Sequence, residues 1–186
     1  KAKAFVQEYT ELPIVFESSV MGTAMANIDF RKEIDPDCKN VGFIQYGNNI
    51  HFLSTYLSEP LETYHNRTDF VNKIIVDPNS KEICTCGRRG CVENEITAKA
   101  VRREIANIYS KDNTPFLYKE TGGKVEKVNG DLIMLAYQKG DKGVIATLDR
   151  ATNLMGVLIN NLNFYSNPQK IMLHLFFFDS EISFDL

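Results

Sequence analysis

The sequence predicts an α/β protein in which strands alternate with the helices that cover them. Three patterns indicate this fold class. Residues 170–178 form a near-continuous apolar run, which is typical of a strand buried on both faces of a sheet. Residues 141–164 carry apolar side chains at helical spacing along their whole length. Residues 41–56 show a strand, a tight turn and a second strand, the pattern of a hairpin.

The N-terminal part of the chain predicts three elements. A helix over 2–10 leads to a short apolar run at 14–16 that is expected to be a buried strand. A helix over 20–30 follows, with Ser18 and Ser19 as suitable N-cap residues. This helix is rich in small residues, which favours close packing against a neighbouring element.

The middle of the chain begins with a turn at 34–38, which we take as a crossing between two domains. The hairpin then divides into strands over 41–46 and 50–56, joined at 47–49. A further short strand is expected at 73–76, before an Asp-Pro-Asn-Ser turn.

The C-terminal half is expected to be mostly helical. Amphipathic spacing predicts a helix over 93–109. A loop or hairpin is expected at 121–129, followed by a shorter helix over 130–138. The long helix over 141–164 ends before Asn-Pro, because proline disfavours helix in the residue before it. The apolar strand over 170–178 follows.

Composition restricts the classes of function. The chain has 186 residues, a net charge of −3 and a pI of about 5.7, which argues against this segment gripping a nucleic-acid backbone. It contains neither 18 consecutive apolar residues nor a secretory signal, so we expect a cytoplasmic protein that does not cross a membrane. Both ends lie in patterns that look interrupted, and we therefore expect a fragment of a longer protein.

Three of the four cysteines fall within eight positions, in the string CTCGRRGCVE over 84–93. Thiolates of Cys84, Cys86 and Cys91 at C-x-C and C-x4-C spacing can point at one soft cation such as zinc. Glycines between them allow the tight turns that a small cage needs. This clustering predicts a structural zinc site in a reducing compartment rather than a disulfide framework. The alternative is a cysteine-rich surface turn without metal.

Structural zinc takes four ligands, and three cysteines leave one position open. Cys38 and His65 are the candidates from elsewhere in the chain, although an ordinary buried thiol and a plain loop histidine are the simpler interpretations. His51 and His174 lie on predicted strands, and we expect them to be structural.

The string over 84–93 resembles the C-x-C-G-x-x-G-C-x-E signature of the ROK family (repressors, open reading frames and sugar kinases). Segments at 12–17, 76–78 and 140–171 resemble further family motifs in the same order. The resemblance implies the actin-like, ribonuclease H-like two-lobe ATPase fold. It places 1–36 at the end of the first lobe and 37–186 in the second, with the N-terminal DNA-binding region and the C-terminal end missing.

The departures from the family pattern concern its kinase residues. The resemblance puts Ser19 where family kinases have the aspartate base, and a serine hydroxyl has no suitable pKa for that task. Ser18 replaces a sugar-contacting asparagine, Phe70 replaces a sugar-binding glutamate, and Lys73 replaces the histidine that ligates zinc. Of the sugar-contacting set only Glu93 remains, and its alternative role is a favourable charge at a helix N-terminus.

The nucleotide-binding motifs also depart from the family. The glycine-rich phosphate run is replaced at 45–51, where only Gly47 remains, and the late glycine pair that meets adenosine is His174-Leu175. From these losses we predict that the protein is not an enzyme but a degenerate sugar-kinase scaffold.

The leading hypothesis is the effector-sensing and oligomerising part of a ROK-type transcriptional repressor of carbohydrate metabolism. A sugar or sugar phosphate would bind at Glu93, Ser18, Ser19 and Lys73, and DNA would be bound only through the missing region of a homodimer. One alternative is a sugar kinase that phosphorylates a hexose with ATP, with Glu17 or Asp29 as base. Another is a pseudoenzyme that serves as a protein-interaction module.

Overall fold

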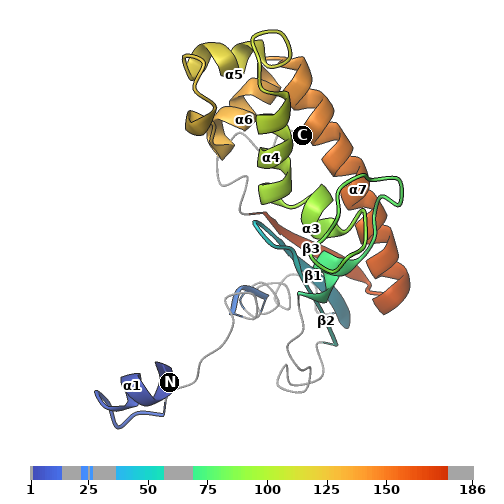
Figure 1. Cartoon of the computed structure of the whole chain (residues 1–186). Coiled ribbons are helices and arrows are strands. Elements are labelled where there is room, and N and C mark those ends of the chain that lie inside the picture. The colour runs from blue at the N-terminus through green and yellow to red at the C-terminus, as the bar shows by residue number, and fades with distance from the viewer. Residues whose placement is uncertain (1, 14–21, 25, 27–36, 57–68, 176–186) are drawn as a thin grey trace.

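In the part of the chain that the structure describes, the centre is a three-stranded sheet with the order β2-β1-β3 (Figure 1). The computed structural model describes residues 2–13, 22–24, 26, 37–56 and 69–175. β1 (Asn40–Tyr46) is the middle strand, and all of its residues are buried. It pairs antiparallel with β2 (His51–Tyr56) and parallel with β3 (Lys170–Leu175). The predicted hairpin and the predicted C-terminal strand are therefore confirmed over these residues.

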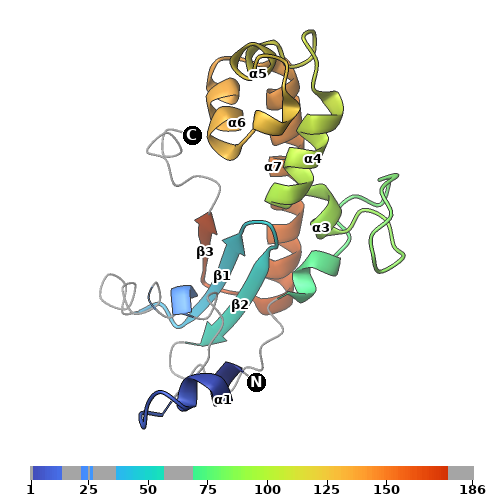
Figure 2. The same ribbon diagram turned by 60° about the vertical axis from the view of Figure 1, so that its left-hand side comes forward.

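The helices α4 (Ala98–Ile108) and α7 (Lys142–Ser166) run beside each other, and the C-terminal part of α7 lies against the sheet (Figures 1 and 2). The shorter helices α5 (Pro115–Glu120) and α6 (Gly130–Gln138) lie at the end of this pair that is farther from the sheet (Figure 2). Further helices are α1 (Ala2–Gln7), η2 (Phe70–Lys73), α3 (Val92–Glu95) and η3 (Val125–Lys127). Residues 22–24 and 26 are also helical, as predicted for the helix over 20–30.

One apolar core joins the sheet to the helices. It includes Ile44 and Phe52 from the sheet, Val101 and Ile105 from α4, and Ala151, Leu158 and Leu162 from α7. Each fully buried Leu or Ile side chain contributes roughly 2 kcal/mol to the free energy of folding. The predicted apolar stripe of the longest helix is thus the surface by which α7 packs on the core.

The residues that flank α7 make different hydrogen bonds at its two ends. Asp141 precedes the helix, and its Oδ2 accepts hydrogen bonds from the backbone N–H groups of Phe116 and Leu117, at 3.1 and 3.2 Å. The same carboxylate therefore ties the start of α7 to the start of α5. At the other end Asn167 adopts the left-handed conformation, with φ of 41°, and its N–H bonds to the Asn163 carbonyl.

Two predicted elements are wrong. The strand expected at 73–76 is the end of η2 followed by one isolated bridge between Ile75 and Cys91, because the chain turns directly toward the cysteine loop. The helix expected over 93–109 is divided into α3 and α4. Thr97 causes the break: its hydroxyl accepts from the Ala100 N–H at 3.2 Å and so starts a new helix.

Other differences concern shorter stretches. The helix α5 was not predicted, although a proline at its first position is a common helix start. Leu173 of β3 is 48% exposed among the described residues, so burial on both faces does not hold there. The predicted strand at 14–16 and most of the predicted helix over 20–30 lie outside the described residues. The domain boundary at 36/37 stays a prediction.

No helix among the described residues combines the length and the apolar character needed to cross a bilayer.

Candidate metal centre and the carboxylate beside it

The three clustered cysteines lie on one closed loop, residues 77–91, between Val76 and α3. Two backbone hydrogen bonds close its base: the N–H groups of Val76 and Asp77 both donate to the Gly90 carbonyl, at 2.8 and 3.3 Å. Gly90 has φ of +68°, and a Cβ there would lie 1.7 Å from the Asp77 carbonyl oxygen. A glycine is therefore required at the position that brings the chain back to Cys91.

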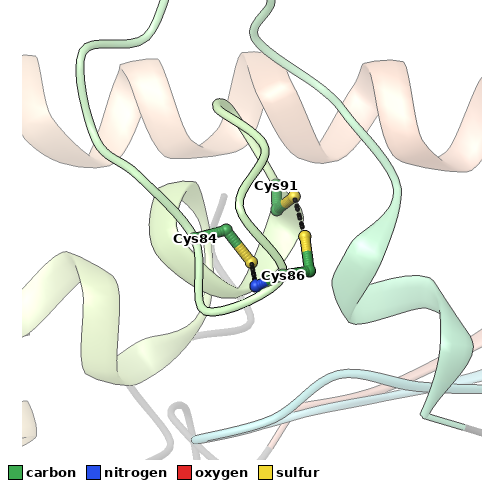
Figure 3. A group of neighbouring side chains, drawn as sticks. All are labelled: Cys84, Cys86 and Cys91. Carbon is green, nitrogen blue, oxygen red and sulfur yellow. Dashed lines mark hydrogen bonds between the residues drawn. The ribbon is translucent and has the colours of Figure 1, made fainter.

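The loop places the sulfur atoms of Cys84, Cys86 and Cys91 within 4.8 Å of one another (Figure 3). The Sγ atoms of Cys86 and Cys91 are 3.7 Å apart. Tetrahedral zinc with Zn–S bonds of about 2.3 Å would hold neighbouring sulfurs about 3.8 Å apart. The three predicted ligands are thus brought together, and their donor atoms and spacing fit a thiolate-bound metal.

A fourth protein ligand does not join this group among the described residues. Cys38 is buried elsewhere, with its Sγ 3.8 Å from the Asn40 carbonyl oxygen, as expected for an ordinary buried thiol. His65 lies outside the described residues. Lys73 does approach the group, with its Nζ 3.6 Å from the Cys84 Sγ, but a protonated amine has no lone pair for a metal.

The thiols differ in their electrostatic environment. The Arg88 Nε donates to the Cys86 Sγ at 3.4 Å, and this hydrogen bond lowers the pKa of the exposed Cys86 thiol to about 6. Burial raises the pKa of the Cys91 thiol to about 12. Metal binding requires all ligating thiols to be deprotonated, so a bound cation would have to displace the Cys91 proton.

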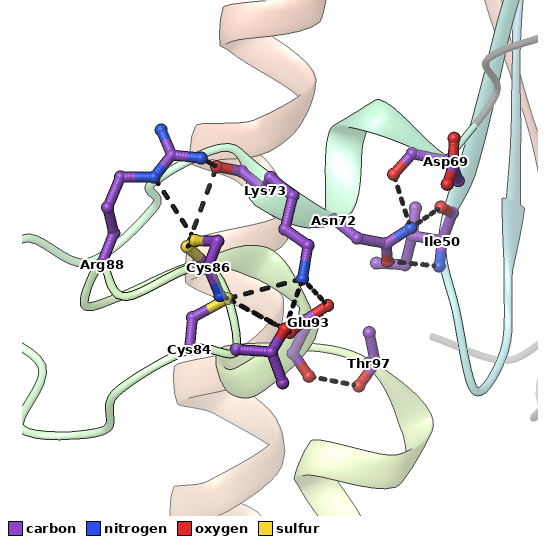
Figure 4. A network of polar contacts seen from close by, with 11 residues as sticks. Ile50, Asp69, Asn72, Lys73, Cys84, Cys86, Arg88, Glu93 and Thr97 are labelled. Atoms are coloured by element: carbon purple, nitrogen blue, oxygen red, sulfur yellow. Dashed lines mark hydrogen bonds and ion pairs between the residues drawn. The ribbon is translucent and has the colours of Figure 1, made fainter.

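Glu93 lies directly beside the cysteines, on the first turn of α3, and is held by three donors (Figure 4). Lys73 Nζ is 2.5 Å from its Oε2, while Thr85 Oγ1 and Cys84 Sγ donate to its Oε1 at 2.9 and 3.1 Å. Burial would raise the pKa of this carboxyl group, but the hydrogen bonds from Lys73, Cys84 and Thr85 outweigh it and lower the pKa to about 2. Glu93 is therefore an ionised acceptor with a fixed orientation at neutral pH.

The position of Lys73 follows from the helix that carries it. The Asn72 side chain bonds both the N–H and the carbonyl of Ile50, at 2.9 and 2.7 Å, and so fastens η2 to the start of β2 (Figure 4). Lys73 is the next residue, at the end of η2, and its side chain extends toward Glu93. Of the predicted cleft residues the structure brings Glu93 and Lys73 together, while Ser18 and Ser19 lie outside the described residues.

Three residues of this site were missed by sequence reasoning. Thr85 stands between two cysteines of the motif, a position that does signal closeness to the site. Arg88 also lies inside the motif, and its guanidinium bonds both Cys86 and the Lys73 carbonyl. Arg150 contacts the site region from α7, and no local pattern indicated this.

The ROK family model matches residues 62–174 of the chain. The curated glucokinase of Thermotoga maritima is 28% identical over 100 residues, which are 54% of this chain and 31% of that protein. A solved ROK family glucokinase of Streptomyces griseus, in complex with glucose and AMPPNP, is 20% identical and covers 93% of this chain and 55% of its own, with a TM-score of 0.73. A solved ROK family transcriptional regulator, described as a homologue of the E. coli MLC protein, is 19% identical, with 92% and 41% coverage and a TM-score of 0.68.

The two likenesses in structure confirm the predicted α/β, actin-like fold class. The chain spans about a third of the curated glucokinase and about half of the solved one. These relatives contradict the prediction that the protein is not an enzyme, because the curated relative and the first solved one are both glucokinases. The prediction depended on Ser19 at the position of the base, which lies outside the described residues, and on the departures from the family motifs at 45–51 and 174–175.

Proposed function

Since the chain belongs to the ROK family, we propose that the complete protein is a sugar kinase that binds a hexose beside Glu93 and phosphorylates it with ATP. The single observation that carries this proposal is the carboxylate of Glu93. It is ionised, only 22% exposed and oriented by three donors, as an acceptor of sugar hydroxyl groups needs to be. The likeness to a curated glucokinase supports the choice of a hexose.

The Glu93 carboxylate would act on the sugar by binding and orientation. An ionised carboxylate accepts about four hydrogen bonds, and Lys73 and Thr85 provide one to each oxygen. Cys84 donates a third only as a thiol, so a metal-bound thiolate at Cys84 would leave one acceptor position on each carboxylate oxygen. Two hydroxyl groups of one sugar ring can therefore bond the same side chain. Such a contact fixes the ring relative to the phosphoryl donor, which is a large part of what a kinase contributes.

We propose zinc as the resident metal of Cys84, Cys86 and Cys91, with a structural role. When bound, it would tie the loop over 77–91 to the start of α3, whose first turn carries Glu93. The Lys73 and Arg88 side chains lie beside the sulfurs and would offset part of the negative charge of three thiolates.

The proposed catalytic base and the phosphate contacts come from other segments of the chain. Glu17 and Asp29 are the candidates for the base, and both lie outside the described residues. The turn at 47–49 corresponds to the family's phosphate run. Its Gly47 carbonyl accepts from the Ala98 N–H at 2.9 Å, which connects this turn to the start of α4.

The second candidate function is a sugar-responsive transcriptional regulator of the same family. The likeness to the solved regulator favours it, together with Ser18, Ser19 and Lys73 at positions where family kinases have other residues. In that case a carbohydrate at Glu93 would act as effector, and DNA contacts would come from residues beyond this chain, whose net charge is −3.

The test uses the full-length protein and a panel of hexoses. Binding is measured by calorimetry and turnover by hexose-dependent formation of ADP, for the wild type, Glu93→Gln and a control variant. Glu120→Gln is the matched control, because Glu120 is an exposed glutamate on α5, away from the cysteine loop. We expect Glu93→Gln to weaken hexose binding by about tenfold or more, as for loss of a charged hydrogen bond, with Glu120→Gln unchanged.

The outcomes separate the two functions. Hexose-dependent turnover establishes the kinase, whereas hexose binding without turnover favours the regulator. Absence of hexose binding to the wild-type protein excludes the hexose kinase and a regulator whose effector is a hexose. Equal binding by the wild type and Glu93→Gln would remove Glu93 from the sugar site.

A further inference from the structure

A single guanidinium joins the two ends of the segment that carries the site. The Nη2 of Arg150, on α7, lies 2.8 Å from Asp77 Oδ2 and 2.6 Å from Glu95 Oε2. Asp77 stands where the cysteine loop begins, and Glu95 is the last residue of α3, two positions after Glu93. The cysteines and Glu93 all lie between these two contacts in the sequence.

The segment needs an external support because α3 is only four residues long. A single helical turn is unstable alone, so packing and side-chain bonds must set its direction. At the other end, the Asp77 N–H bonds the Gly90 carbonyl, and Gly90 directly precedes Cys91. A bond to Asp77 therefore holds both ends of the cysteine loop, the end at Asp77 and the end at Gly90.

The Arg150 bridge is anchored by a buried group. The Glu95 side chain is 3% exposed, and its Oε1 has no hydrogen-bond partner among the described residues, so Arg150 supplies the charge that Glu95 needs. Two cavities, of about 550 and 310 Å³, flank the bridge, and both Arg150 and Glu95 line each of them. Asp77 lines only the smaller of the two cavities, and its Oδ2 is held there by the ion pair with Arg150.

We propose that Arg150 is a positioning residue that sets the place of Glu93 and of the cysteine loop against the long helix α7. It touches neither the thiols nor Glu93 and acts through Asp77 and Glu95. For the sugar this inference rests on the proposed function, whereas for the metal it depends only on the thiolate cluster. Both contacts are made by Nη2, whose two N–H groups can each donate to one carboxylate, and the guanidinium stays charged when it is partly buried.

The experiment measures two affinities in the full-length protein: zinc by competition with a chromophoric chelator, and glucose by calorimetry. The variants are Arg150→Met, Arg150→Lys and, as control, Lys99→Met, which removes an exposed positive charge from α4. We expect Arg150→Met to weaken both affinities by about tenfold or more, in the range seen for supporting residues of metal sites. Arg150→Lys should lose less of both affinities than Arg150→Met. Lys99→Met should change neither the zinc nor the glucose affinity by more than about twofold.

A double variant separates positioning from simple charge balance. Arg150→Met with Glu95→Gln removes the unpaired buried carboxylate, so positioning predicts that thermal stability recovers while both affinities stay weak. Full recovery of the affinities in the double variant, or unchanged affinities in a folded Arg150→Met, would overturn the proposal. If Arg150→Met does not fold, the zinc and glucose affinities of Arg150→Lys are compared with those of the wild type, and unchanged affinities would overturn the proposal.

The two affinities also distinguish this proposal from the proposed function. A wild-type protein that binds zinc but no hexose refutes the sugar kinase, and its zinc affinity still decides the role of Arg150. A wild-type protein that binds glucose but no zinc leaves the decision to the glucose affinity. A wild type that binds neither has no site for Arg150 to position, and the inference fails.

Discussion

Lys73 and Glu93 form an ion pair beside the clustered thiols, with Lys73 Nζ 2.5 Å from Glu93 Oε2. Lys73 also lies 3.6 Å from the Cys84 Sγ, so one ammonium contacts both the carboxylate and the sulfur cluster. The hydrogen bond with Glu93 raises the pKa of Lys73, and the same contact helps to lower the pKa of Glu93. The candidate sugar-binding group and the candidate metal ligands are thereby parts of one charge network.

Replacing Lys73 by methionine should raise the pKa of Glu93 from about 2 toward its ordinary value. The reason is that the carboxylate loses its cationic partner while keeping the two donors on Oε1. Carboxyl-carbon NMR titration of the metal-free protein measures this pKa directly. Lys99→Met is the control and should leave it unchanged, and an unchanged value in Lys73→Met would show that the ion pair does not form in solution.

The stability contributed by Glu93 should disappear in acid. Because its pKa is lower in the folded protein than the ordinary 4.5, this contribution is fully present above about pH 4.5 and is lost as the pH falls toward 2. We expect the wild type to exceed Glu93→Gln by about 1 to 2 kcal/mol at pH 6, allowing for partial exposure. The gap should shrink to roughly a quarter of this value near pH 2.5 and close below the folded-state pKa of about 2. Urea unfolding of the metal-free proteins at several pH values measures the gap, and a gap independent of pH contradicts the assignment.

Metal titration should show one zinc ion per chain. Serine at Cys84, Cys86 or Cys91 should lower the zinc affinity sharply, because each removes one of three thiolate ligands. Cobalt substitution provides an optical signal from thiolate-to-metal charge transfer. Cys38→Ala is the matched control, since Cys38 lies apart from the cluster, and it should still bind one ion. Equal affinity in Cys91→Ser and the wild type would rule out this cluster as the metal site.

Alanine at Gly90 should destabilise the protein much more than alanine at Gly87. Both glycines have positive φ, +68° and +83°, so both substitutions carry the left-handed penalty of about 1 to 2 kcal/mol. At Gly90 the new Cβ would also lie 1.7 Å from the Asp77 carbonyl oxygen, whereas at Gly87 no atom lies within 4 Å. We expect a further loss of about 2 kcal/mol or more at Gly90, measured by urea unfolding. Similar losses of unfolding free energy for the two variants would contradict the close contact between Gly90 and the Asp77 carbonyl oxygen.

Much of this fold could be predicted from local patterns. The stripe of α7, the hairpin of β1 and β2 and the run of β3 each repeat within one element, so spacing alone identifies them. The break between α3 and α4 was less visible, because Thr97 fits the same amphipathic pattern that it interrupts. The apolar residues at 74–76 fitted the pattern of a strand, but they form only one isolated bridge, between Ile75 and Cys91.

The sequence by itself determined which residues form the thiolate cluster, because Cys84, Cys86 and Cys91 lie close enough along the chain for two glycine turns to bring them together. Only the tertiary structure decided what surrounds that cluster. Lys73 reaches Glu93 across 20 positions, and Arg150 reaches Glu95 and Asp77 across 55 and 73. Such contacts depend on how η2 and α7 pack against the loop, and packing between distant elements leaves no spacing pattern in the sequence.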